Sequence, residues 1–173
     1  MRFFLSAALA LLTSACSTAA QPPASHDLGV SIMPTAAMKS SHITAPNWLQ
    51  DNRIRYRLLY AAPTEVRFYS LDRWLAPPPE LLEHLITSEN YLLNIQLNEF
   101  EQRFDTPHTS RVVLEFFVEA FNPETKQRLD AQGFHFERTT VTPDAAGAIA
   151  GLADLTQQAA EKVKAWLTQL PAQ

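Results

Sequence analysis

The residue whose chemistry the sequence defines best is its single cysteine, Cys16. It follows two small residues and an apolar run from Phe3 to Leu12, which begins after the positive Arg2. A positive start, a short apolar segment and small residues before a cut are typical of a secretory leader. A thiol directly after the cut can carry diacylglycerol and acyl chains such as palmitate. We therefore predict that residues 1–15 are a lipoprotein signal peptide and that Cys16 is lipidated.

The leader also indicates how the protein is held at a membrane. Its apolar run is about half the roughly 20 residues that a membrane-spanning helix needs, so the lipid is the expected anchor. Thr13 stands where such leaders usually have Leu. In bacterial lipoproteins generally, the residue after the lipidated cysteine directs sorting, and Ser17 in place of Asp indicates delivery to the outer membrane. We expect a lipid-anchored protein on the outer membrane that faces the periplasm.

Other reactive side chains do not form a catalytic or metal-binding pattern in the sequence. Ser40, Ser41 and His42 lie together but lack the G-x-S-x-G turn of a hydrolase. Glu80 and Glu83 are typical of a solvated helix face. The chain has four glycines and no glycine-rich phosphate-binding loop in its sequence. The histidines are spread without metal-ligand spacing: His26, His42, His84, His108 and His135. The sequence predicts no enzyme, no metal and no cofactor.

Composition limits both the partners and the size of the fold. Removing residues 1–15, which hold one charged residue, takes the net charge from -4 to -5. An acidic domain is a poor ligand for nucleic acid, which needs clustered Lys and Arg. Residues 16–26 are polar and contain prolines, so we expect a lipidated tether there. Residues 27–173 have the length of one domain.

The first half of the domain predicts short strands and one short helix. Leu28 to Met33, Ile54 to Leu59 and Glu65 to Tyr69 have strand-like patterns. The second and third of these are expected to form a hairpin around Ala61 to Thr64, because that segment has turn chemistry. Consecutive prolines then introduce a helix over Pro79 to Thr87, where proline is tolerated in the first turn.

The second half predicts three long strands. Apolar residues alternate over 91–105, with a change of parity that indicates a bulge near Asn98 and Glu99. Val112 to Phe121 is apolar on both sides and is expected to be central. A turn at Asn122 to Thr125 then leads to a strand over Arg128 to Val141. Short polar connections between these strands predict an antiparallel meander.

The clearest helix covers Asp144 to Leu170. Thr142 is placed to cap it, Pro143 fits its first position, and apolar residues recur at spacings of three and four. Such an amphipathic helix usually packs on a sheet. The sequence thus predicts an α+β fold: a single domain whose antiparallel β-sheet is packed by a short middle helix and a long C-terminal helix.

Three short motifs in this order resemble a known family. They are Trp48-Leu49, the strand Ile54-Arg55-Tyr56-Arg57, and Arg73-Trp74-Leu75-Ala76-Pro77 before the middle helix. With the leader and the later strands, they resemble the ABC-type transport auxiliary lipoprotein component family, the PqiC-like intermembrane transport lipoproteins. The resemblance covers nearly all of the mature chain. The 91–105 strand pattern is longer than is usual in that family.

The resemblance implies a docking adaptor that does no chemistry. In such systems a mammalian-cell-entry (MCE) domain protein forms a periplasmic conduit for lipid, and inner-membrane transport components lie beneath it. The lipoprotein docks from the outer membrane. The family-motif residues become the candidate docking residues: Trp48, Tyr56, Arg57, Arg73 and Trp74.

The sequence leaves the roles of these residues open. Arg73 and Trp74 fit a docking epitope, since Trp and Arg are enriched at interface hot spots, but Trp74 also fits the core. Tyr56 and Arg57 point to opposite faces of their strand, so one is expected to be structural and the other exposed. A different function also fits: ten phenylalanines could line an apolar groove between helix and sheet that binds a phospholipid or glycolipid.

Overall fold

The computed structural model describes residues 21–29 and 42–171. Cys16, Ser17 and most of the strand predicted over Leu28 to Met33 lie outside these residues. The elements, in chain order, are β1 (Ala24–His26), β2 (His42–Thr44), η1 (Asn47–Leu49), β3 (Arg53–Leu58), β4 (Ala62–Trp74), α1 (Pro78–Glu83), β5 (Leu92–Thr106), β6 (Thr109–Phe121), β7 (Arg128–Thr139) and α2 (Ala145–Leu167).

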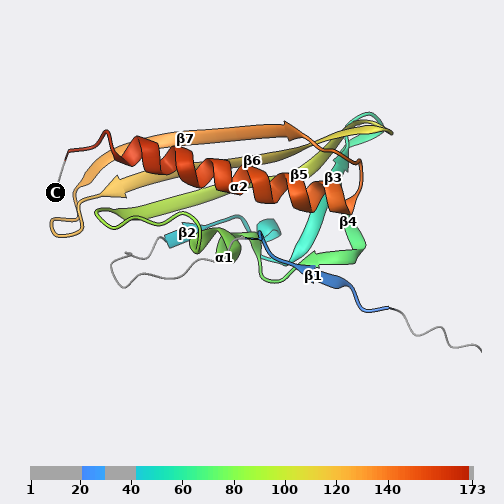
Figure 1. The fold of residues 1–173 in the computed structure, drawn as a ribbon, viewed down its shortest axis with the longest axis horizontal. Coiled ribbons are helices and arrows are strands. Elements are labelled where there is room, and N and C mark those ends of the chain that lie inside the picture. The colour runs from blue at the N-terminus through green and yellow to red at the C-terminus, as the bar shows by residue number, and fades with distance from the viewer. Residues whose placement is uncertain (1–20, 30–41, 172–173) are drawn as a thin grey trace, which may run out of the picture.

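Within the described residues, seven strands form one sheet in the order β1-β4-β3-β5-β6-β7, and β2 also pairs with β5. Figure 1 shows α2 lying lengthwise along β5, β6 and β7 on one face of this sheet. The short helix α1 lies beside β2 (Figure 1). The predicted α+β fold in a single domain, with a short middle helix and a long C-terminal helix, is confirmed.

The sheet is mixed, whereas the sequence predicts an antiparallel one. β3 and β4 form the expected antiparallel hairpin, but β3 also pairs in parallel with β5, where Tyr56 lies opposite Gln102. The chain passes through β4 and α1 before it enters β5, which allows the same direction for β3 and β5. β1 pairs in parallel with β4, and β2 with β5. These two strands have three residues each, too few to produce a recognisable alternation.

The N-terminal boundary differs from the prediction. Residues 24–26, the end of the expected tether, form β1 and pair with Asp72, Arg73 and Trp74 of β4. Leu28 is buried but is not part of a strand. The hairpin turn also lies earlier than predicted, at residues 59–61, so β4 starts at Ala62.

The long meander follows the predicted pattern closely. β5, β6 and β7 are antiparallel neighbours, and the β5–β6 register shifts between Leu97 and Glu99, where a bulge is predicted. The bulge changes which side chains face α2: Ile95 and Leu97 before it, and Phe100 and Gln102 after it. Glu99 and Glu101 consequently belong to the opposite face of the sheet.

The helices are shorter than predicted. α1 ends at Glu83, and α2 ends at Leu167. The cap of α2 is Asp144 and not Thr142, because the Asp144 carboxylate accepts a hydrogen bond of 2.9 Å from the backbone N–H of Gly147. The Thr142 hydroxyl instead donates to that carboxylate. None of the helices in the described residues is long and apolar enough to cross a membrane.

The core lies between α2 and the sheet. Leu152, Leu155 and Val163 of α2 are buried there, as are Val112 and Leu114 of β6. The layers approach most closely at Gly151, where an added Cβ would lie 2.8 Å from Val112 Cγ2. Near the other end, the ring of Trp166 meets that of Phe134 with their centroids 6.0 Å apart. The Trp166 indole N–H also donates to Asp130 at 3.0 Å.

Candidate functional site: an arginine pocket on the open face

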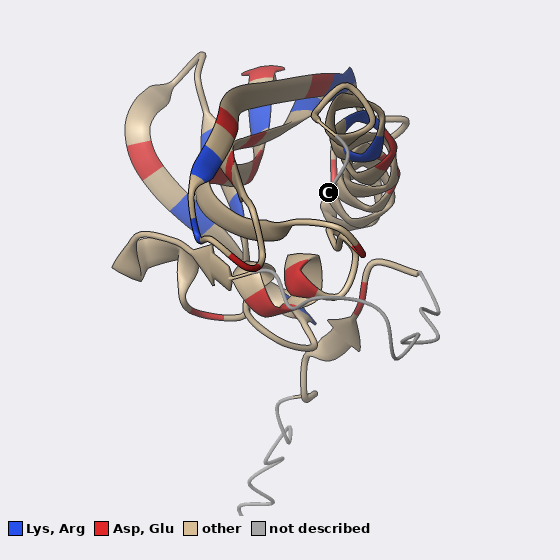
Figure 2. Cartoon of the chain, turned by 90° about the vertical axis from the view of Figure 1, so that its left-hand side faces the viewer, with Lys and Arg blue, Asp and Glu red and all other residues tan. Residues whose placement is uncertain are grey.

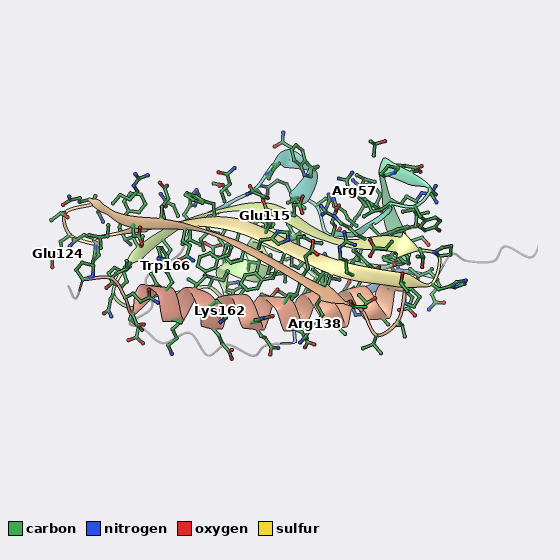
Figure 3. All side chains as sticks on the ribbon, turned by 90° about the horizontal axis from the view of Figure 1, so that it is seen from above. Arg57, Glu115, Glu124, Arg138, Lys162 and Trp166 are labelled. Atoms are coloured by element: carbon green, nitrogen blue, oxygen red, sulfur yellow. The ribbon has the colours of Figure 1, made fainter. Side chains whose placement is uncertain are left out.

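The sheet face that α2 does not cover, which we call the open face, carries paired charges. Figure 2 shows basic and acidic residues next to one another on the strands, and Figure 3 places Arg57 and Glu115 on the side of the sheet away from α2. Arg57 Nε lies 3.0 Å from Glu101 Oε1, and Arg103 Nε lies 2.9 Å from the same oxygen. His135 Nδ1 lies 3.0 Å from Glu115 Oε2. The first and third of these pairs join neighbouring strands, β3 to β5 and β6 to β7.

Three arginines of β3 point to one pocket on the open face. Arg53, Arg55 and Arg57 are spaced two residues apart, so their side chains lie on the same side of the strand. The pocket has a volume of about 420 Å³. Of the three, only Arg57 is among the site residues that the sequence predicts. The alternation of arginines at three consecutive odd positions was the signal that could have found the other two.

The walls of this arginine pocket are mostly apolar. Trp48 and Leu49 come from η1, and Val66 and Phe68 come from β4. Trp48 is 64% exposed, so it forms a rim, whereas Leu49 is buried. The guanidinium of Arg53 stacks 3.6 Å from the centre of the Phe68 ring. This cation–π contact holds the Arg53 guanidinium against the aromatic wall of the pocket.

Arg55 is the unusual residue of the pocket. Its side chain is only 3% exposed, and its Nη1 has no hydrogen-bond partner among the described residues. Its Nη2 lies 3.0 Å from Asp51 Oδ2, within ion-pair distance but outside hydrogen-bond geometry. Buried polar groups are nearly always paired, so an unpaired one needs a reason.

The carboxylates near the pocket are already engaged. Asp51 accepts hydrogen bonds from Arg53 Nη2 at 2.7 Å and from Arg53 Nε at 3.1 Å. Partial burial raises the pKa of Asp51, but the hydrogen bonds from Arg53 and the nearby positive charge of Arg55 outweigh this and lower it to about 2. Glu101 accepts from both Arg57 and Arg103. Four arginines thus face three carboxylates, since Glu99 also pairs with Arg103.

The other family-motif residues lie apart from the pocket. Tyr56 faces the α2 side, where its ring centre is 4.8 Å from that of Tyr69. Arg57 does lie on the opposite face, but it is half-buried instead of exposed. Trp74 is buried in the core with its ring 5.5 Å from Phe100. The structure thus joins Trp48 and Arg57 in one site and assigns Trp74 to the core.

Arg73 lies on a different exposed surface. Its Nε donates to Ser25 Oγ of β1 at 3.1 Å. Two positions away on either side, Leu71 and Leu75 are 60% and 65% exposed. We call Leu71, Arg73 and Leu75 the β4 strip. Large exposed apolar side chains flanking an arginine are a composition found in protein interfaces.

A second hollow lies at the C-terminal end of α2. It has a volume of about 600 Å³ between α2 and the segment that joins α1 to β5. Its lining mixes apolar and charged side chains, including Leu85, Tyr91, Leu167, Leu170, Glu161 and Lys164. The space directly between α2 and the sheet is instead occupied by buried core side chains such as Phe116 and Phe134.

A metal site is not present within residues 21–29 and 42–171, since no three His, Cys, Asp or Glu residues are grouped there to hold an ion. His26 pairs with Asp72 at 2.8 Å, and His135 with Glu115 and Glu137. These histidines therefore contact carboxylates on the surface of the sheet.

Comparison with known proteins identifies the fold. No family model and no curated protein matches the chain. A crystal structure of a Xanthomonas campestris protein of the family DUF330 matches with a TM-score of 0.65 at 16% identity, over 85% of this chain and 93% of that one. The crystal structure of an uncharacterized protein matches with a TM-score of 0.62 at 14% identity, over 85% and 99%. At these identities the likeness shows a shared fold.

Proposed function

We propose that this protein is an outer-membrane lipoprotein that acts as a docking adaptor in an intermembrane lipid transport system. Cys16 would carry the lipid, and the folded domain would face the periplasm. Its partner would be an MCE-domain protein linked to inner-membrane transport components. The proposal rests on the leader and on the three ordered motifs, and a fold shared with a DUF330 protein is compatible with it.

The observation that carries the docking role is the β4 strip. Leu71 and Leu75 expose most of their side chains beside Arg73, whose hydrogen-bond partner among the described residues is the Ser25 hydroxyl. An apolar pair around a cation of this kind buries well against a partner that offers apolar surface and a carboxylate. Adaptor activity needs no catalytic group, and we assign none.

Affinity purification after crosslinking tests the docking role. We expect the wild-type lipoprotein to recover an MCE-domain protein from membranes, and the double variant Leu71→Asp/Leu75→Asp to lose it. Val141→Asp is the matched control, since Val141 is also an exposed apolar residue, at 97%. Absence of any MCE-domain protein in the wild-type sample would rule out the adaptor role. If both variants recovered the MCE-domain protein equally, the docking surface would lie outside the β4 strip.

The anchor is tested separately. Cys16→Ser should abolish acyl labelling and release the protein from membrane fractions, because no other cysteine is available. A variant that still carries label or stays with membranes would contradict the lipid anchor.

A second candidate function is lipid carriage in the hollow at the end of α2. The favouring observation is its size, about 600 Å³, together with leucines and a tyrosine in its lining. Native mass spectrometry discriminates the two functions. A co-purifying lipid that disappears in Leu167→Glu would support carriage, and an empty protein would support the adaptor alone.

A further inference from the structure

The unpaired group of Arg55 is the strongest unexplained feature of the described residues. Its guanidinium is withdrawn from water, yet Nη1 bonds to nothing among them. Leaving such a charged donor without an acceptor costs free energy that a ligand oxygen would recover. Because Arg55 lines the arginine pocket, that oxygen can reach it from the pocket.

The neighbouring arginines also have N–H donors that make no hydrogen bond to the described residues. Arg57 bonds Glu101 through Nε alone, so neither of its Nη groups has a hydrogen bond to a described residue. Arg53 uses Nε and Nη2 for Asp51, which leaves Nη1. The pocket therefore presents unused N–H donors from three guanidinium groups, while its carboxylates are occupied by Arg53, Arg57 and Arg103.

The number of donors indicates the ligand. A carboxylate has two acceptor oxygens and forms its bidentate pair with one guanidinium, whereas a phosphate group has more acceptor oxygens and can accept from three guanidinium groups at once. The pocket is also much larger than one anion, at about 420 Å³, and its walls include Trp48, Val66 and Phe68. Such walls can contact an organic group attached to the phosphate.

We infer that the arginine pocket binds a phosphate group, supplied either by a phospholipid headgroup or by free phosphate. Arg55 would meet it at the pocket floor, with Arg53 and Arg57 on its sides and Trp48 at the rim. This inference goes beyond the docking role and does not depend on it. The β4 strip and the pocket use different residues, so either assignment can fail without the other.

Isothermal titration calorimetry of the full chain in a nonionic detergent tests the inference. The probes are inorganic phosphate, a soluble short-chain phosphatidylglycerol, and an acidic glutamyl peptide, each at the same ionic strength. We expect at least one phosphate probe to bind more tightly than the peptide, and Arg57→Gln to weaken that binding by about tenfold or more. Arg55→Met should weaken it at least as much.

The matched control is Arg67→Gln. Arg67 lies on β4 between two pocket residues but pairs outward with Glu65 at 3.0 Å, and it does not line the pocket. It should bind the probes as the wild type does. Thermal unfolding of every variant shows whether it is folded, and Arg53→Gln provides a third pocket variant if Arg55→Met does not fold.

Each result has a defined meaning. Binding of both phosphate probes supports a site that recognises the phosphate itself, and binding of the lipid alone supports a headgroup site that needs the attached glycerol. Loss of binding in Arg67→Gln equal to that in Arg57→Gln would overturn the inference, as would binding of neither phosphate probe. Tighter binding of the glutamyl peptide would also overturn it and assign the pocket to an acidic protein segment.

Discussion

Two buried polar side chains on adjacent strands differ in one respect that separates structure from function. Gln102 of β5 is fully buried beneath α2 and has all its partners. Tyr69 donates to its Oε1 at 2.5 Å, and its Nε2 donates to Ser110 Oγ at 2.8 Å and to the Asp144 carbonyl at 3.3 Å. Arg55 of β3, on the open face, is 3% exposed and has an unpaired Nη1.

This difference distinguishes a residue that stabilises the fold from a residue that binds a ligand. A satisfied buried network fixes the geometry of the layers that it joins, here β4, β5, β6 and the start of α2. A buried donor without an acceptor, such as Nη1 of Arg55, adds nothing comparable to stability and is therefore best explained by a ligand. The helix-covered side of the sheet is thus the structural region, and the open face around β3 is the binding region.

The largest loss of stability is expected at Gln102, on the helix-covered side of the sheet. Gln102→Leu should lower the free energy of unfolding by about 2 kcal/mol, because it leaves the partly buried Tyr69 hydroxyl without its acceptor and removes the buried bond to Ser110. Burial raises the pKa of Tyr69, as do the charges of Tyr56, Asp144 and Asp72. Urea denaturation measures the loss. Gln96→Leu, at an exposed site on the same strand, should change stability little.

Loss of the Asp144 cap at the start of α2 should lower the free energy of unfolding by a smaller amount. Asp144→Ala should lower the free energy of unfolding by about 1 kcal/mol through loss of the cap, while Asp144→Asn should retain most of it. The pKa of Asp144 is lowered, first by the Gly147 N–H and then by the Thr142 hydroxyl. The cap therefore stabilises the fold above the ordinary pKa of 3.8 and weakens as pH falls through the folded value. Equal stability of all three proteins at pH 7 would contradict this account of the cap.

The stability of an Arg55 variant tests whether this residue belongs to the binding region. Arg55→Met should change the free energy of unfolding by less than about 1 kcal/mol, or raise it, since an apolar side chain of similar length removes a buried guanidinium without hydrogen bonds while Asp51 keeps Arg53 as its partner. Arg67→Met is the exposed reference. A loss of about 2 kcal/mol, as expected for Gln102→Leu, would mean that Asp51 and Phe68 make Arg55 a structural residue.

The smallest effect on stability is expected at His135, which also lies on the open face. The pKa of His135 is raised above 6.5, first by its hydrogen bond to Glu115 and also by Glu137, although desolvation opposes this. Its pairing therefore stabilises the fold fully below the unfolded pKa and is lost as pH rises through the folded value. NMR titration of the His135 ring should show the raised pKa. Glu115→Gln should lower it, and an unchanged value would exclude the ion pair.

The sequence predicts the structural region better than the binding region. The meander, its bulge near Asn98 and the helix α2 follow from periodicity, which reports burial directly. The parallel pairing of β3 with β5 joins segments about 45 residues apart and leaves no local pattern. The pocket depends on that pairing, because Glu101 of β5 meets Arg57 of β3 only there. The sequence therefore indicates Trp48 and Arg57 as separate candidates and does not predict that they line one pocket.

The most direct test measures stability and binding together in Arg55→Met and the wild type. The midpoint of thermal unfolding is recorded for both proteins with and without saturating phosphate probe, at constant ionic strength. A ligand that binds only the folded state raises this midpoint. We predict a rise in the wild type and none in Arg55→Met, with similar midpoints in the absence of probe. Equal rises in both proteins, or none in either, would contradict the assignment of Arg55 to ligand binding.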